Sequence, residues 1–393
     1  MGERQTIVIC GAGIGGLVAA LAIAEAGYHV VVCERAEELT EIGAGIQLSP
    51  NAGRILAGLG LEKAIGDIAI QPKAIDVRNG KTGRVVASIP VDAFRDRYGY
   101  PYQVIHRAAL QAVLAKAVRR RHDAELRFGA VIGDVLSKRG MLFVKTQKAG
   151  GSELIAASGL IGADGVWSAT RGRIAGASEP RSTGRTAWRA VIPLDNAPAS
   201  LAADRVTLWL GSEAHLVHYP VAGGAAINVV AIVEEEWDKP GWTAPGDRVW
   251  LLERFGAWTT EVRELLNAPF SWLKWAITAV DPGGPWTDGA VALLGDAAHA
   301  MPPFLAQGAA MAIEDAAVLG RALGAAPDVA AGFHAYEAER KPRVTRVWKA
   351  ARRSGEHYHL GPRMAALRDL ALGVAGPAIV LRQNDWIYRW QPE

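Results

Sequence analysis

The sequence predicts an α/β fold, because two kinds of hydrophobic pattern share one chain of 393 residues. Residues 7–10 are β-formers, and a glycine turn, an alanine-rich helical stretch over 17–26 and a second β-run over 29–33 follow them. This strand–helix–strand order is typical of a parallel sheet covered by helices. Residues 183–280 instead alternate and are rich in aromatic side chains, which indicates an antiparallel sheet. From residue 309 onwards the pattern is mostly helical, so C-terminal helices complete the predicted fold.

Composition narrows the class of protein. Half of the residues are hydrophobic and 21% are charged, as in a soluble globular protein, and the net charge of +3 gives no reason to expect nucleic acid binding. Cys10 and Cys33 both lie in predicted buried strands. We therefore interpret them as small core residues in a reducing, cytoplasmic compartment, and we expect no disulfide and no metal site.

An apolar stretch near the C-terminus, residues 370–381, has the composition of a membrane helix. It is too short to cross a bilayer, and charged residues flank it on both sides. We therefore expect a buried helix that breaks at Gly376-Pro377, and no membrane span. The apolar N-terminal segment carries glycines at the spacing of a nucleotide-binding turn, which argues against a signal peptide.

The glycine turn is the strongest local signal in the chain. Gly11 permits a sharp turn out of the strand, Gly13 lets a pyrophosphate approach the backbone, and Gly16 lets the helix pack closely on the strand. The phosphate would lie on the free N–H groups at the helix start. Glu34 ends the second β-run, where an acid accepts hydrogen bonds from an adenosine ribose. The stretch predicts a dinucleotide site; a tight turn in an unrelated parallel sheet is the alternative.

Two further turns follow predicted buried strands. The segment 162–165, Gly-Ala-Asp-Gly, is expected to lead into a helix. The segment 295–299, Gly-Asp-Ala-Ala-His, leads through Pro302-Pro303 to a helix over 309–323. Because the carboxyl ends of parallel strands meet at one edge of a sheet, all three turns are expected to lie together where α/β proteins bind ligands.

Capping and turn signals predict the remaining elements. Ser49-Pro50 is a favourable helix start, with serine as the N-cap and proline at the first helical position. The other expected segments are a helix over 52–59, short strands over 70–100, a helix over 108–121, a strand meander over 125–157 and helices near 246–266.

The change of pattern along the chain predicts two domains. Residues 1–70, 101–182 and 286–393 would form the nucleotide-binding domain with the C-terminal helices. Residues 71–100 and 183–285 would form a substrate-binding sheet domain. Most of the tryptophans lie in the second domain, and we interpret them as a lid over a flat apolar ligand; an aromatic core without a binding role is the alternative.

Together the three turns resemble those of the single-component FAD-dependent aromatic hydroxylases of the para-hydroxybenzoate hydroxylase type. The resemblance covers nearly the whole chain and is nearest to salicylate hydroxylase, 3-hydroxybenzoate 6-hydroxylase and 6-hydroxynicotinate 3-monooxygenase. It implies a Rossmann-like FAD-binding domain, and NAD(P)H as the reductant, with NADH favoured. It also implies O2 as co-substrate and a flavin C4a-hydroperoxide that hydroxylates an aromatic or heteroaromatic acid. A monomer or a homodimer is expected.

The resemblance also assigns cofactor contacts. Asp296 would bind the ribityl hydroxyls, and Arg107 would lie near the pyrophosphate. Asp164 would support FAD and nicotinamide binding indirectly. The N–H groups around Gln307 and Gly308, at a helix start, would stabilise the negative charge of the reduced flavin; Ala306 stands before them where many relatives carry glycine. The full expected set is Gly11, Gly13, Ile14, Gly15, Gly16, Glu34, Arg35, Gln47, Arg107, Asp164, Asp296, Pro303, Gln307 and Gly308.

His215 and Tyr219 are the candidate catalytic residues. Residues four apart in a strand lie on one face, so both side chains can enter one pocket, and His218 would point to the other side. The resemblance implies that a base there removes the proton of a phenol; a purely structural histidine is the alternative. Arg189 would pair with a substrate carboxylate or with cofactor phosphates. Pro302 and Phe304 would wall the substrate site, and His299 would orient their loop.

Two other functions fit the same pattern. One is a monooxygenase or epoxidase of a non-aromatic substrate, which would not need a phenol base. The other is a flavin-binding protein without oxygenase turnover, acting as a redox sensor or a partner-binding module. We expect no disulfide reductase, because the chain has neither a second nucleotide-binding glycine motif after a strand nor a CxxC motif.

Overall fold

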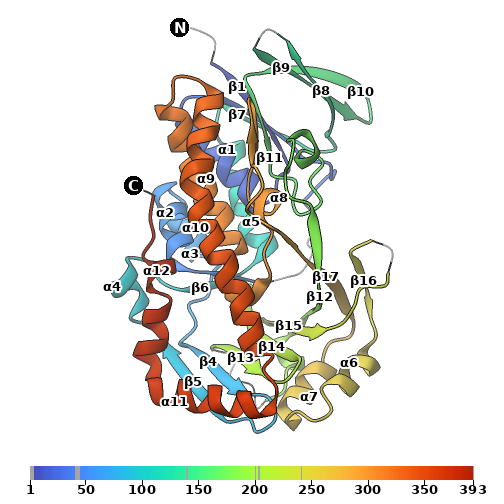
Figure 1. Cartoon of the computed structure of the whole chain (residues 1–393), viewed down its shortest axis with the longest axis vertical. Helices are drawn as coiled ribbons and strands as arrows, with labels where there is room; N and C mark the ends of the chain where they lie inside the picture. The colour runs from blue at the N-terminus through green and yellow to red at the C-terminus, as the bar shows by residue number, and fades with distance from the viewer. Residues whose placement is uncertain are drawn as a thin grey trace.

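The computed structural model describes residues 4–39, 45–138, 140–199, 201, 204–239 and 241–392. Figure 1 shows one sheet in the upper half of the molecule and a second sheet in the lower half, with the long helix α10 (Val329–Tyr358) running beside both. Part of the predicted glycine-rich loop, residues 41–44, lies outside the described residues.

The upper sheet has six strands in the order β18-β19-β11-β1-β2-β7. Each neighbouring pair is parallel except β18–β19, which is antiparallel. The carboxyl ends of β1, β11 and β19 therefore meet at one edge, and the predicted α/β fold is confirmed. The strands are β1 (Thr6–Cys10), β2 (His29–Cys33), β7 (Ala124–Arg127), β11 (Gly159–Gly162), β18 (Thr287–Asp288) and β19 (Val291–Leu293).

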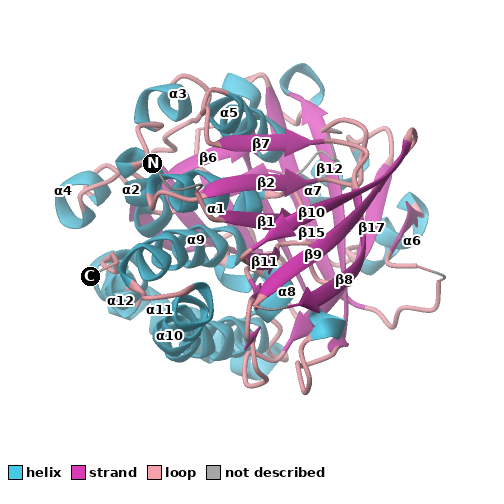
Figure 2. Ribbon diagram, turned by 90° about the horizontal axis from the view of Figure 1, so that it is seen from above, coloured by secondary structure: helices cyan, strands magenta, loops and turns pink. Residues whose placement is uncertain are grey.

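Helices cover one face of this sheet and a small antiparallel sheet covers the other (Figure 2). Alternate residues of β1 point to opposite faces of the sheet. Ile7 and Ile9 pack under the helices, and Val8 packs against the small sheet. Burial on both faces explains why β1 reads as an unbroken apolar run. The covering elements are α1 (Ile14–Glu25), α5 (Arg107–Arg119), α9 (Gly308–Ala325), β8 (Val131–Lys138), β9 (Met141–Lys148) and β10 (Gly151–Ala157).

The lower sheet has eight strands in the order β16-β17-β12-β15-β14-β13-β4-β5, antiparallel except for β13–β4. The helices α6 (Arg248–Arg254) and α7 (Thr260–Asn267) pack on its outer face. The predicted antiparallel sheet and both helical segments are therefore confirmed. The strands are β4 (Ala74–Asn79), β5 (Val85–Pro90), β12 (Pro180–Pro193), β13 (Val206–Leu210), β14 (Ala214–Val221), β15 (Ala226–Glu234), β16 (Thr243–Gly246) and β17 (Trp272–Val280).

The tryptophans of this sheet mostly form a core. Trp188 and Trp209 pack with α6 and α7 on the outer face, and the ring of Trp188 stacks on that of Trp250 with centroids 5.2 Å apart. The predicted aromatic lid is wrong for these residues, because alternation along the strands turns them away from the inner face. Trp275 is directly opposite Ala187, which precedes Trp188 in β12 and therefore points to the other side of the sheet. Trp275 thus lies on the inner face, the face away from α6 and α7.

One local prediction was wrong, and one predicted helix start is confirmed without its side-chain capping bond. The Asp-Gly turn at 164–165 leads only to a short 3-10 helix, η1 (Arg171–Arg173). Ser49 is the N-cap residue of α2 (Pro50–Gly58) but makes no capping bond, because its hydroxyl donates to Asn51 Oδ1 instead. The other short elements are β3 (Gly45–Leu48), which pairs with β6 (Gln103–His106), and α3 (Glu62–Gly66), α4 (Phe94–Tyr98), α8 (Asp296–His299), η2 (Leu194–Asn196), η3 (Ala222–Gly224) and η4 (Pro303–Leu305).

The C-terminal apolar helix is not buried. In α11 (Pro362–Gln383), which lies against β5 and precedes α12 (Asp385–Tyr388), Leu370, Val374 and Ile379 are exposed. The predicted break is present, since Gly376 adopts a φ of 71°. By length and composition alone the segment 362–388 could cross a membrane, which is weak evidence of a span. Hydrophobicity predicted burial here, but one side of the helix has no partner within the described chain.

Candidate active site

The glycine turn after β1 leaves room for a ligand at one glycine only. Gly11 has a φ of 104°, and a Cβ on it would lie 2.5 Å from the carbonyl oxygen of Ala163. A Cβ on Gly16 would collide with the carbonyl oxygen of Gly11. A Cβ on Gly13 would meet nothing within 4 Å, and Gly13 is the N-cap of α1. Packing therefore demands two of the glycines, while open space at the helix start fits a phosphate group.

Glu34 holds the turn from the end of β2. Its Oε2 accepts a hydrogen bond from the backbone N–H of Ala12 at 2.8 Å, and its Oε1 accepts from Ala36 at 3.0 Å. A carboxylate has further lone pairs, so these bonds leave capacity for the hydroxyls of a ribose. Arg35 is exposed beside it, and Ile14 is buried in the first turn of α1.

The side chain of Asp164 stabilises the Asp-Gly turn after β11. Asp164 accepts hydrogen bonds from the Ser168 hydroxyl, from the Thr170 N–H at 3.1 Å and from the Thr170 hydroxyl at 3.0 Å. With its carboxylate used inside the turn, Asp164 shapes the edge of the site through the backbone.

The third turn presents a carboxylate to solvent. Gly295 has a φ of 62°, and Asp296, which begins α8, is exposed and has no hydrogen-bond partner for its carboxylate among the residues that the structure describes. Arg107 is exposed at the start of α5. The charges of both residues act on the pKa of Arg189, which Arg107 lowers and Asp296 raises, so both lie within electrostatic range of it.

The N-terminus of α9 lies next to this turn. Ala306 adopts a left-handed φ of 52°, which is uncommon for a residue with a side chain. The Gln307 amide donates to the Ser49 hydroxyl at 3.0 Å and accepts from Asn51 at 3.1 Å. Its side chain is therefore turned inward to α2, and the backbone N–H groups around Gly308 stay available to a ligand.

A buried ion cluster supports both of these segments. Asp315 accepts hydrogen bonds from the Gly295 N–H at 3.1 Å and from Arg340 Nε at 2.8 Å, and it contacts His299 Nε2 at 2.6 Å. The neighbouring Glu314 pairs with Arg340 at 2.8 Å. His299 thus lies in a structural cluster. Sequence reasoning missed the two acids, although a Glu-Asp pair inside an apolar helical run is the signal that could have found them.

One face of the lower sheet carries the candidate substrate residues. His215 is opposite Ile232 and Tyr219 is opposite Asn228, and Arg189 is opposite Val230 between them, so the three side chains share the inner face. His218 lies on the other face, where its ring stacks on Trp209.

Arg189 and Tyr219 form one end of this face. Burial lowers the pKa of Arg189, and among the described residues it has neither an ion pair nor a hydrogen bond, only the ring of Trp275 at 5.2 Å. Burial raises the pKa of Tyr219, and the charge of Arg189 opposes this shift. The ring of Tyr219 fills the space beside Gly45. The Oε1 atom of Gln47 accepts a hydrogen bond from the hydroxyl of Tyr102, and the Gln47 side chain also lowers the pKa of Tyr219.

His215 forms the other end. Its Nδ1 lies 2.7 Å from Nε2 of His359, and its ring meets those of Phe304 and Tyr358 edge-on at 5.4 and 5.3 Å. Burial is the main cause that lowers its pKa well below the usual value. Phe304 lies in η4, directly after the buried Pro302 and the half-buried Pro303, so this turn walls the site.

The structure thus brings the inner-face residues, Gln47 and Phe304 to one region, with Arg107 and Asp296 near it, while Glu34, Arg35 and Asp164 belong to the turns of the parallel sheet. His359 and Tyr358 come from the end of α10 and were missed, because nothing in the sequence connects the end of that helix to a strand 144 positions earlier.

Comparisons with known proteins identify the family to which the chain is similar. The family described as "FAD binding domain" matches residues 4–351. The chain is 36% identical over 387 residues to 3-hydroxybenzoate 6-hydroxylase 1 of Aquipseudomonas alcaligenes, covering 98% of each chain. It is 34% identical over 353 residues to 6-hydroxynicotinate 3-monooxygenase of Pseudomonas fluorescens, covering 88% and 90%. Among solved structures, HpxO of Klebsiella pneumoniae complexed with FAD and uric acid matches with a TM-score of 0.83 and 25% identity, covering 96% and 95%.

Proposed function

The chain belongs to the FAD-binding-domain family of flavoprotein monooxygenases, and we propose that it uses NAD(P)H and O2 to hydroxylate an aromatic or heteroaromatic acid. The relatives support this substrate class, because they are named for hydroxylated benzoate and nicotinate. FAD would lie on the parallel-sheet domain, and the substrate would lie on the domain of residues 71–100 and 183–285. NADH is the favoured reductant, and the proposed setting is a cytoplasmic monomer or homodimer.

The observation that carries the proposal is the chemistry of one sheet face. It presents an imidazole at His215, a phenol at Tyr219 and, in Arg189, a guanidinium without an anionic partner in the described chain. These groups complement a flat ring that bears a hydroxyl and a carboxylate. The aromatic wall at Phe304 lies next to the imidazole.

The residues of the parallel-sheet edge fit FAD. Open space at Gly13, the free carboxylate of Asp296 and the helix start at Gly308 are the features that a pyrophosphate, a ribityl chain and a flavin ring require. Bound FAD would accept electrons from NAD(P)H and activate O2, which is the source of the transferred oxygen atom.

The protein's own part in the reaction is to bind and ionise the substrate. Arg189 would hold the carboxylate, since a guanidinium matches it with two hydrogen bonds. The Nε2 atom of His215 has no partner among the described residues and would take the proton of the ring hydroxyl. The resulting phenolate is a stronger nucleophile. The Pro302–Phe304 turn would exclude water from this reaction.

The first test is NADH and NADPH consumption by the purified yellow protein with a panel of aromatic acids, including 3-hydroxybenzoate, salicylate and 6-hydroxynicotinate. The expected result is that one acid accelerates oxidation and gains the mass of one oxygen atom. An accompanying loss of CO2 would identify decarboxylative hydroxylation. If no aromatic acid changes the rate with either reductant, the aromatic hydroxylase is wrong and a non-aromatic substrate takes its place.

A further inference from the structure

A proton taken up by His215 cannot stay there. The imidazole is buried, and the loss of solvent, the neighbouring His359 and the charge of Arg185 all lower the pKa of His215. A buried cationic ring would therefore form only at a high cost in free energy. If His215 acts as the base of the proposed function, the proton needs a route out of the site.

The structure contains such a route in the direction away from the substrate face. Nδ1 of His215 lies 2.7 Å from Nε2 of His359. Nδ1 of His359 lies 3.5 Å from Oε1 of Glu234, which is an ion-pair distance and not a hydrogen bond in this conformation, so the last transfer requires the two side chains to move closer. The three side chains come from β14, the end of α10 and the end of β15. Exposure rises along them: the side chain of His359 is 2% exposed and that of Glu234 is 44% exposed.

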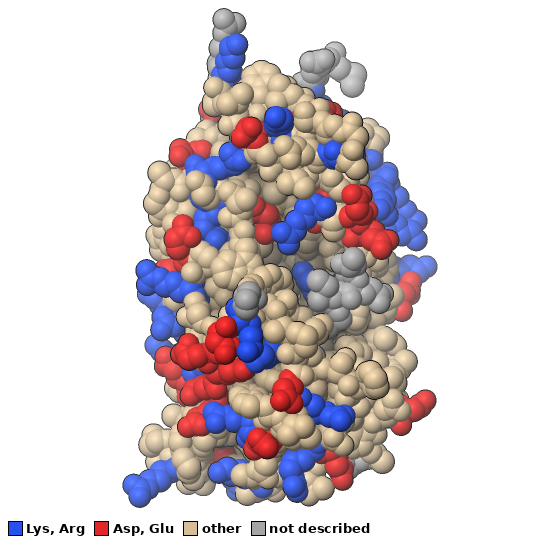
Figure 3. Space-filling view, turned by 90° about the vertical axis from the view of Figure 1, so that its right-hand side faces the viewer, with Lys and Arg blue, Asp and Glu red and all other residues tan. Residues whose placement is uncertain are grey.

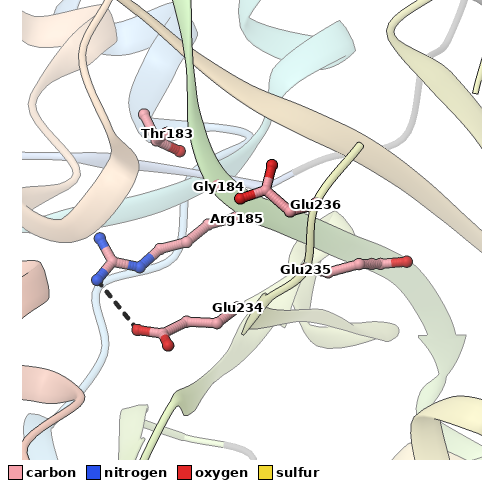
Figure 4. A pocket seen from close by; sticks show the side chains of 6 residues that line it. All are labelled: Thr183, Gly184, Arg185, Glu234, Glu235 and Glu236. Atoms are coloured by element: carbon pink, nitrogen blue, oxygen red, sulfur yellow. Dashed lines mark hydrogen bonds and ion pairs between the residues drawn. The ribbon is translucent and has the colours of Figure 1, made fainter. Parts of the chain in front are cut away.

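Glu234 opens onto a surface pocket of about 440 Å³ that Thr183, Gly184, Arg185, Glu235 and Glu236 also line (Figure 4). The Oε1 atom of Glu234 that faces His359 is also the atom that pairs with Arg185 at 3.3 Å. Water in this pocket can exchange protons with the carboxylate. The pocket itself lacks the aromatic lining of a ring-binding site, so we assign it the outer end of the route.

We propose that His215, His359 and Glu234 form a proton relay from the substrate hydroxyl to solvent. The substrate O–H proton moves to Nε2 of His215 while the Nδ1 proton of His215 moves to Nε2 of His359. The Nδ1 proton of His359 then passes to Glu234 and from there to water in the pocket. One proton enters and one leaves, so both imidazoles end neutral with exchanged tautomers. The idea rests on the proposed function, because it needs an ionisable substrate.

The surrounding groups favour neutral rings, as a relay of this kind requires. Burial is the main cause that lowers the pKa of His359, and Arg185 and Arg254 act in the same direction while Glu234 opposes them. Tyr358, the other polar group beside His215, already donates its hydroxyl proton to the carbonyl of Phe304 at 3.0 Å. Within the described residues this leaves His359 as the acceptor for the Nδ1 proton of His215.

The test measures proton release without turnover. Oxidised holoenzyme is mixed, without NAD(P)H, with the acid that the wild type hydroxylates, in weak buffer containing a pH indicator. His359→Gln keeps a polar side chain but cannot pass a proton, so we expect release to slow by about 10²-fold. Added imidazole should restore the rate. Substrate affinity and the flavin spectrum should stay as in the wild type.

Two more variants complete the design. Glu234→Gln changes only a surface group, so the variant should fold as the wild type does. We expect it to release the proton more slowly, at a rate that rises with buffer concentration. His357→Gln is the matched control, because His357 is exposed on the same helix two positions earlier and lies outside the relay. Release by this variant should equal that of the wild type.

The outcomes separate the relay from the proposed function. If the wild type binds the acid without releasing a proton, the base role of His215 fails and the relay fails with it. If the wild type releases a proton and His359→Gln does so equally fast, the relay alone is overturned. Slow release that imidazole does not restore, together with weaker substrate binding, would show that His359 only positions His215 and would also overturn the relay.

Discussion

Arg189 is the residue on which the proposal of an acidic substrate rests. It is surrounded by β-sheet and by the ring of Trp275, and no described carboxylate lies within ion-pair distance. Arg189 is half-buried, but its Nε is fully buried without a hydrogen-bond partner among the described residues, which is costly unless a ligand supplies the acceptor. The residue therefore predicts more about the ligand than any of the glycines do, since those are needed for any dinucleotide.

We predict that Arg189→Gln raises KM for the carboxylate substrate and changes kcat much less. A hydrogen bond to a charged group contributes about 1.5–3 kcal/mol, so the increase should be about 10- to 100-fold. Steady-state kinetics with the acid and with its amide measure the effect, because the amide should lose little. Arg181→Gln, an exposed residue of the same strand, serves as the control. Equal losses for acid and amide would contradict the assigned role.

Asp315 joins the Gly295 turn, His299 and Arg340 in the core, and its side chain is fully buried. Asp315→Asn leaves Arg340 with one anion fewer, so we expect a loss of about 3 kcal/mol in the free energy of unfolding. Denaturant titration measures it. Glu339→Gln breaks an exposed pair with Arg321 and should cost less than about 1 kcal/mol. A similar cost for both variants would show that the cluster adds no special stability.

Among the elements, the turn between β1 and α1 contains one glycine that is needed for cofactor binding and another that is needed for folding. Gly13 has φ −67° and ψ 177°, which alanine adopts without strain, and its Cβ would enter open space. Gly13→Ala should therefore keep the stability of the apoprotein and raise the FAD dissociation constant about ten-fold or more, equivalent to 1.4 kcal/mol. Gly16→Ala should instead destabilise the apoprotein, because its Cβ meets the Gly11 carbonyl. Flavin fluorescence and apoprotein unfolding distinguish the two effects.

How well the sequence predicts an element depends on whether its signal is local. The strand, turn and helix up to Glu34 follow from spacing and backbone sterics, so they were predicted correctly. Trp188 and α11 show the opposite case, because hydrophobicity does not say which face of a sheet or helix finds a partner. Ser49 shows a third case, in which a buried network with Asn51 replaces the expected cap.

At the scale of the whole molecule, the site is assembled from parts far apart in the chain. His215 comes from the lower sheet, Phe304 from the turn before α9 and His359 from the end of α10. Only the folded chain brings these three rings together, so the sequence could propose His215 and Phe304 but not their shared neighbour.

Figure 3 shows acidic and basic side chains interspersed over one face, in keeping with the small net charge.

Buried histidines predict how stability changes with pH. Burial is the main cause that lowers the pKa of His215, His218 and His359, and it lowers that of His218 to about 3. In the unfolded chain a histidine has a pKa of about 6.5, so below that pH the unfolded state binds more protons and stability falls. Each such group contributes a slope of about 1.4 kcal/mol per pH unit between its unfolded and folded pKa values.

We therefore predict that the free energy of unfolding is nearly constant between about pH 7 and pH 8 and falls steadily from about pH 6.5 towards pH 4. His218→Gln should reduce this slope by about 1.4 kcal/mol per pH unit, because it removes one group that charges only on unfolding. Denaturant titrations at several pH values measure the slopes. His334→Gln, exposed on α10, should leave the slope unchanged. If the slope in His218→Gln equals that of the wild type, His218 takes up its proton in the folded protein, and its burial on the outer face of the sheet does not keep it neutral.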